Sequence, residues 1–142
     1  MKPFQIVIDT NVLITAAKSN LGASYKLLSL VDSGKFEVNI SVPLLFEYEE
    51  VLRRTQPQTG LTDSDITDLL DYLCQIARPH KISYLWRPFL TDADDDFILE
   101  LAIQSQSDYI ISYNKKDFKN VEWFGITVLT SKEFLQQIGE CL

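Results

Sequence analysis

Short β-rich apolar segments alternate with helical segments along this 142-residue chain, and that alternation most constrains its fold. The β-rich segments are residues 4–8, 36–41, 109–113 and 126–130, and residues 80–87 are an ambiguous further strand. We expect helices over residues 23–33, 43–54, 93–106 and 131–138, and others that begin near residues 11 and 62. This order predicts an α/β fold with a mainly parallel sheet. No linker or internal repeat interrupts it, so we expect a single domain over residues 1–142.

Residues at the segment ends favour these boundaries. Gly34 suits the C-cap of the helix over residues 23–33, and Pro43 suits the first turn of the next helix. Ser131 is the expected N-cap of the last helix, with Glu133 nearby. Residues 55–62 contain a proline and a glycine, so we expect them to form the longest loop.

The composition excludes several kinds of site. The chain has one histidine, His80, and two distant cysteines, Cys74 and Cys141, which is too few for a zinc site or a disulfide framework. Its 20 acidic and 13 basic side chains give a net charge of −7, which argues against nucleic-acid binding by bulk positive charge. We therefore expect chemistry that depends on carboxylates.

The sequence shows no targeting or membrane segment. Asp9 interrupts the apolar N-terminal stretch before it is long enough for a signal peptide. No segment approaches the roughly 20 apolar residues of a membrane span. We expect a cytoplasmic protein.

Acidic residues follow the strands of the expected sheet. Asp9 follows residues 4–8, Glu47 lies early in the helix after residues 36–41, the 92–96 run begins a helix, and Asp117 follows residues 109–113. Ligands of an open parallel sheet bind beyond the carboxyl ends of its strands, so these acids should converge. Converging carboxylates require cations, and oxygen ligands favour Mg²⁺ or Mn²⁺.

Helical spacing selects among neighbouring acids. Glu49 and Glu50 have Arg53 and Arg54 four residues later, the spacing of exposed ion pairs. Glu47 has Val51 at that spacing, so we expect Glu47 to be the acid that binds a metal.

The choice within the 92–96 run stays open. Asp95 shares a helical row with Ile98 and Ala102, whereas Asp96 points further outward and Asp92 is a capping candidate. Helix N-termini also attract acids for purely structural reasons, so capping remains an alternative interpretation of Asp95 and Asp117.

The order of these motifs resembles that of PIN-domain proteins. The resemblance rests on four segments: residues 7–12 (VIDTNV), 44–48 (LLFEY), 92–96 (DADDD) and 112–118 (SYNKKDF). The closing VLTSKEFL of residues 128–135 is similar to the bacterial toxin branch, the VapC type. The resemblance implies a three-layer α/β/α sandwich and a metal-dependent ribonuclease, in many members the toxin of a toxin–antitoxin pair.

The resemblance also implies the members of the site. The metal-binding and catalytic acids would be Asp9, Glu47, Asp95 and Asp117, with Asp96 or Asp92 as alternatives to Asp95. Asn11 and Asn114 would be polar supports, and Thr10 and Ser112 hydroxyl neighbours. One or two Mg²⁺ or Mn²⁺ ions would activate water for hydrolysis of RNA. An antitoxin and a homodimer are the implied protein partners.

Two features leave the function open. The basic residues Lys115, Lys116, Lys119, Arg53 and Arg54 can contact RNA phosphates or form surface ion pairs. The aromatic residues Tyr113, Trp123 and Phe124 can stack on bases or simply pack. The alternative to a ribonuclease is a non-catalytic PIN-fold module that binds RNA or protein.

Overall fold

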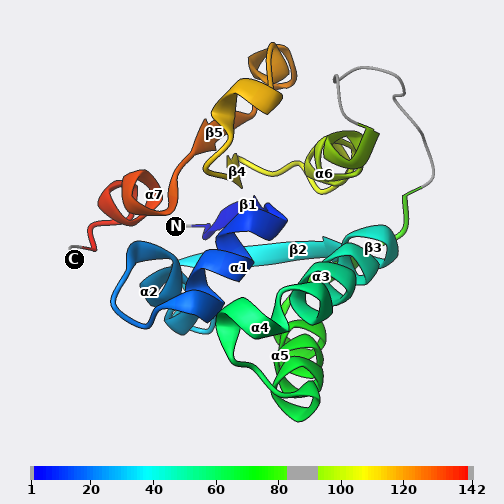
Figure 1. Cartoon of the computed structure of the whole chain (residues 1–142). Helices are drawn as coiled ribbons and strands as arrows, with labels where there is room; N and C mark the ends of the chain where they lie inside the picture. Colours follow the sequence, from blue (N-terminus) through cyan, green and yellow to red (C-terminus); the bar gives the residue numbers. More distant parts are fainter. Residues whose placement is uncertain (1, 83–92, 141–142) are drawn as a thin grey trace.

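A five-stranded parallel sheet forms the centre of the molecule (Figure 1). The structure, a computed structural model, describes residues 2–82 and 93–140, with the side chains of residues 93–96 outside the described part. The strands are β1 (Phe4–Ile8), β2 (Phe36–Ser41), β3 (Arg78–His80), β4 (Tyr109–Ile111) and β5 (Thr127–Leu129). Their spatial order is β3-β2-β1-β4-β5, so the apolar strand that precedes Asp9 lies in the middle of the sheet.

Helices connect the strands and pack on the sheet. They are α1 (Thr10–Lys18), α2 (Ala23–Ser29), α3 (Val42–Arg54), α4 (Gln56–Thr59), α5 (Asp63–Ile76), α6 (Ala93–Gln104) and α7 (Ser131–Gln137). Two short 3₁₀ helices, η1 (Lys115–Asp117) and η2 (Val121–Phe124), lie between β4 and β5. In Figure 1, α7 and α6 lie on opposite sides of the β4 region.

Two buried clusters occupy the two faces of the sheet. Successive side chains of a strand point to opposite faces. Val7 accordingly packs with residues of α3, α5 and α6, whereas Ile6 and Ile8 pack with residues of α2 and α7. Helix α1 contributes Val12 to one cluster and Leu13 to the other. The predicted α/β/α arrangement with a parallel sheet is confirmed.

Two predictions near glycines, one of a helix and one of a loop, need correction. The helix expected over residues 23–33 ends at Ser29, and the chain continues in tighter turns, such as the bond from Leu30 N–H to the Leu27 carbonyl at 3.1 Å. Gly34 lies beyond these turns with φ of +85° and is not the C-cap. The expected loop over residues 55–62 contains the short helix α4, whose C-cap is Gly60 in the left-handed conformation.

Other boundaries shift by a few residues. Thr130, not Ser131, is the N-cap of α7; its hydroxyl accepts from Glu133 N–H, and Glu133 accepts from Thr130 N–H. The ambiguous strand expected over residues 80–87 shares only His80 with β3; residues 81 and 82 are not in a strand, and residues 83–87 lie outside the described part. Within the described ranges, no helix is both long and apolar enough to cross a membrane.

Candidate functional site

Asp9 lies at the carboxyl end of the central strand β1 and caps helix α1. Its backbone is extended, with φ of −67° and ψ of 148°, and its Oδ1 accepts from Thr10 N–H at 2.8 Å. Its own N–H donates to the Ile111 carbonyl of β4 at 2.9 Å. Asp9 is therefore the N-cap of α1, and this role uses only one of its two carboxylate oxygens.

The second oxygen of Asp9 accepts hydrogen bonds from two other side chains. Ser112 Oγ donates to Oδ2 at 2.7 Å, and Asn11 Nδ2 donates to it at 3.2 Å. Ser112 directly follows β4, so a residue from the neighbouring strand end reaches Asp9, as the parallel topology predicts. Asp9 is 7% exposed and Ser112 is fully buried.

Burial dominates the electrostatics of Asp9. Desolvation raises the pKa of its carboxyl above the ordinary value, and the negative charge of Asp117 raises it further. The hydrogen bonds from Ser112, Thr10 N–H and Asn11 lower the pKa but do not offset the desolvation. A positive charge beside Asp9 would therefore stabilise its ionised form.

Ser112 connects the support residues to one another. Its Oγ accepts from Asn114 N–H at 3.0 Å and from Asn11 Nδ2 at 3.4 Å while it donates to Asp9. Asn11 Oδ1 in turn accepts from Tyr113 N–H at 3.3 Å. Asn114 contributes its backbone N–H, and its side chain is exposed.

Glu47 reaches the same region from α3. Its Oε2 accepts from Thr10 Oγ1 at 2.7 Å, so Thr10 lies between Glu47 and the Asp9 cap. Glu49 and Glu50 instead form the predicted ion pairs with Arg53 and Arg54, at 2.9 and 3.4 Å. The predicted ion pairs of Glu49 and Glu50 are therefore confirmed, and metal binding by Glu47 stays a prediction.

Asp117 ends the 3₁₀ helix η1, which follows β4. Its N–H donates to the Asn114 carbonyl at 2.9 Å, and buried Phe118 anchors the turn in the core. Asp117 itself is half-buried and close enough to Asp9 to raise the pKa of the Asp9 carboxyl.

The third acid lies at the start of α6. Asp95 and Asp96 fall within Ala93–Gln104, and Ile98 and Ala102 of the predicted row are buried. The side chains of Asp95 and Asp96, and the whole of Asp92, lie outside the described residues. The choice among the three therefore stays a prediction.

The donor set suits a hard divalent cation. Asp9 and Asp117 place two carboxylates near each other, with Glu47 one hydroxyl away from the Asp9 cap. Among the described residues, no group of three or more acidic, histidine or cysteine side chains forms a metal site. Because Mg²⁺ commonly binds through one or two carboxylates and keeps several waters, the described pair is compatible with it.

Among the basic and aromatic candidates, Lys115 forms an ion pair, and Tyr113 and Trp123 are exposed. Lys115 Nζ pairs with Glu133 at 2.6 Å, which ties η1 to α7 and lowers the pKa of the Glu133 carboxyl. Tyr113 is 42% exposed and its hydroxyl bonds to Ser24, while Trp123 is 73% exposed. Neither aromatic is a buried core residue.

Sequence reasoning missed Tyr48. Its ring is buried on α3, and its hydroxyl donates to the carbonyl of Ile8, the residue before Asp9. Burial, together with the charges of Asp9 and Glu47, raises the pKa of this phenol well above its ordinary value. A tyrosine on the apolar stripe of α3 was the available signal, because a buried tyrosine hydroxyl needs a hydrogen-bond partner.

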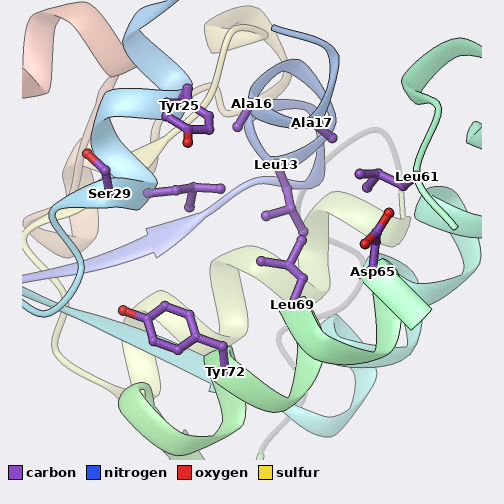
Figure 2. A pocket seen from close by; sticks show the side chains of 10 residues that line it. Leu13, Ala16, Ala17, Tyr25, Ser29, Leu61, Asp65, Leu69 and Tyr72 are labelled. Atoms are coloured by element: carbon purple, nitrogen blue, oxygen red, sulfur yellow. The ribbon is translucent and has the colours of Figure 1, made fainter. Parts of the chain in front are cut away.

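An apolar pocket lies on another part of the surface. Figure 2 shows it between α1, α2 and α5, with Leu13, Leu69, Tyr25 and Tyr72 among its lining residues. Its volume is about 320 Å³, and its lining includes none of the candidate acids. It is therefore separate from the carboxylate site.

Comparison with known proteins places the chain in a family. The model of the PIN domain matches residues 5–116, a span that includes Asp9 and Glu47 and ends one residue before Asp117. No curated protein matches the sequence. Among solved structures, the fold is similar to a chain in the crystal structure of VapBC2 from Rickettsia felis bound to a DNA fragment from their promoter. The identity is 16%, the TM-score is 0.62, and the match covers 89% of this chain and 98% of that one. The chain belongs to the PIN-domain family.

Proposed function

We propose that the chain is a metal-dependent ribonuclease and the toxin component of a toxin–antitoxin pair. The observation that carries this proposal is the state of Asp9: a buried carboxylate at the end of the central strand, with its pKa raised by burial and by Asp117. An acid in this condition favours a bound cation. PIN-domain membership makes nucleic-acid hydrolysis the expected use of that cation.

The residues of the site would divide into metal ligands and residues that orient those ligands. Asp9 and Asp117 would hold Mg²⁺ or Mn²⁺, with Glu47 and Asp95 (or Asp96 or Asp92) completing the site. Ser112 and Asn11 orient the Asp9 carboxylate through hydrogen bonds to Oδ2. Thr10 orients Glu47, and Asn114 fixes the Ser112 hydroxyl through its backbone N–H.

One or two bound ions would supply an activated water and stabilise the charge that develops on the phosphate. The chain's own contribution is to gather carboxylates at one sheet edge and hold them in fixed orientations. No histidine or cysteine nucleophile is required for that chemistry.

An antitoxin is the proposed protein partner. The similar solved chain comes from a VapBC2 complex, and this supports the proposal of an antitoxin partner. We also propose that the chain forms a homodimer and acts on RNA in the cytoplasm.

Expression of this chain alone should arrest bacterial growth, and Asp9→Asn should restore it. Normal growth with the wild-type chain at the same expression level would contradict the toxin role.

The second candidate is a non-catalytic PIN-fold module that binds RNA or protein. It rests on the same PIN-domain membership, which shows the family and not the activity. The two candidates differ in one property, which is metal-dependent cleavage.

Cleavage of structured RNA in Mn²⁺ tests the proposal. The wild-type chain should cut RNA only when Mn²⁺ or Mg²⁺ is present, and Asp9→Asn should remove the activity. Asp108→Asn is the matched control, because Asp108 caps Gln5 N–H at 2.8 Å, at the amino end of the sheet. Absence of cleavage and of Mn²⁺ binding in the wild-type chain would favour the non-catalytic module.

A further inference from the structure

Tyr48 supplies a hydrogen bond at the point where two central strands separate. The pairing of β1 with β2 ends at Ile6 and Val38, whereas β1 stays paired with β4 as far as Ile8 and Ile111. The Tyr48 hydroxyl donates to the Ile8 carbonyl, the last of β1. A buried side chain of α3 therefore donates a hydrogen bond to the last carbonyl of β1, the strand that Asp9 follows.

Two consecutive residues of α3 contact the two neighbours of Asp9. Tyr48 bonds to Ile8 on one side, and Glu47 accepts from Thr10 on the other at 2.7 Å. Asp9 is also held from β4, through its N–H to the Ile111 carbonyl. The position of α3 thus fixes the strand end and one carboxylate together.

We propose that Tyr48 is a positioning residue that sets the placement of the Asp9 carboxylate relative to Glu47. It acts through the Ile8 peptide, not by contact with metal or substrate. This inference rests on the proposed function, because its consequence is a change in the affinity for the divalent cation. Groups that orient metal ligands commonly change that affinity about 10- to 100-fold when removed.

Tyr48→Phe tests the proposal, because it removes the hydroxyl and keeps the buried ring. Mn²⁺ binding measured by calorimetry should weaken about tenfold. The control is Ile66→Val, a change to a fully buried residue of α5 in the same core cluster. This control should lose stability without weakening Mn²⁺ binding, which separates positioning from a general loss of stability.

A measurement on the unaltered protein tests the same contact where Tyr48→Phe does not fold. During a Mg²⁺ titration followed by NMR, the carbonyl resonance of Ile8 should shift together with that of Asp9. An Ile8 resonance that stays constant while Asp9 shifts would overturn the proposal.

The outcomes distinguish the two proposals. Equal Mn²⁺ affinity in wild type and Tyr48→Phe would overturn the role of Tyr48 and leave the proposed function intact. A wild-type chain that binds neither Mn²⁺ nor Mg²⁺ would contradict the proposed function, and the role of Tyr48 with it.

Discussion

Asp9 combines a structural role with an unfavourable charge. It caps α1 and accepts bonds from Ser112 and Asn11, yet burial keeps the pKa of its carboxyl raised. A metal-free protein therefore holds this charge at a cost in stability. Such costs are typical of sites where function and stability compete.

The raised pKa of Asp9 predicts a pH dependence. An acid whose pKa is higher in the folded state stabilises the fold most at low pH, below its unfolded value. That contribution is lost as pH rises through the folded pKa. In EDTA, the free energy of unfolding of wild type should therefore fall relative to that of Asp9→Asn as pH rises from about 4. Urea titrations across pH measure this difference. A difference that is constant with pH, or that grows in favour of wild type, would contradict it.

Ser112→Ala should affect both metal binding and stability. The change removes the donor to Asp9 and the acceptor for Asn114 N–H. We expect about tenfold weaker Mn²⁺ binding and a loss of about 1–3 kcal/mol in unfolding free energy. Ser105→Ala is the control, because Ser105 is also buried and bonds to Ser107 at 2.6 Å. It should lose stability but keep its Mn²⁺ affinity. Similar weakening in both variants would count against a specific role of Ser112.

Among the helices and strands, the helical spacing of charged side chains was informative, and the capping residues at helix ends were less so. The spacing of Glu49 and Glu50 from Arg53 and Arg54 predicted the ion pairs correctly. The prediction of Ser131 as N-cap was wrong by one residue, because a side chain can cap a helix from either of two adjacent hydroxyl residues. Ser131 is instead buried and bonds to Ser24 at 2.9 Å.

The corrected cap of α7 makes its own prediction. Thr130→Ala removes one half of the reciprocal bonds with Glu133 and should cost about 1 kcal/mol in unfolding free energy. Lys132→Ala, an exposed change in the same turn, should cost less than half of that. Chemical denaturation measures both. Equal costs would show that Thr130 does not cap the helix.

At the scale of the whole molecule, topology brings distant residues together. Asp9, Glu47 and Asp117 follow or flank strands of one parallel sheet, so their approach to one edge could be predicted from the order of segments. Two other contacts could not be predicted from the sequence: that of Tyr48 with Ile8 and that of Ser112 with Asn114. Both depend on the directions of side chains within the packed fold. The resemblance implied the identity of the acids, and the structure adds the hydrogen bonds that orient the carboxylates of Asp9 and Glu47.

Metal binding at the Asp9 site should raise the stability of the whole molecule. A ligand that binds only the folded state adds about 2.7 kcal/mol at 100 times its dissociation constant. Thermal unfolding of wild type should therefore shift upward by several degrees in saturating Mn²⁺. The Asp9→Asn variant should shift little. An equal shift in both proteins would indicate that Mn²⁺ acts away from Asp9.

The decisive measurement is a crystal structure with Mn²⁺ bound. We expect an anomalous peak coordinated by the carboxylates of Asp9 and Asp117, with an aspartate of residues 92–96 or Glu47 in the ligand set. Such a map would also give the number of ions. A saturating soak with no anomalous peak within bonding distance of Asp9 would contradict the claim that this sheet edge is a metal-dependent catalytic site.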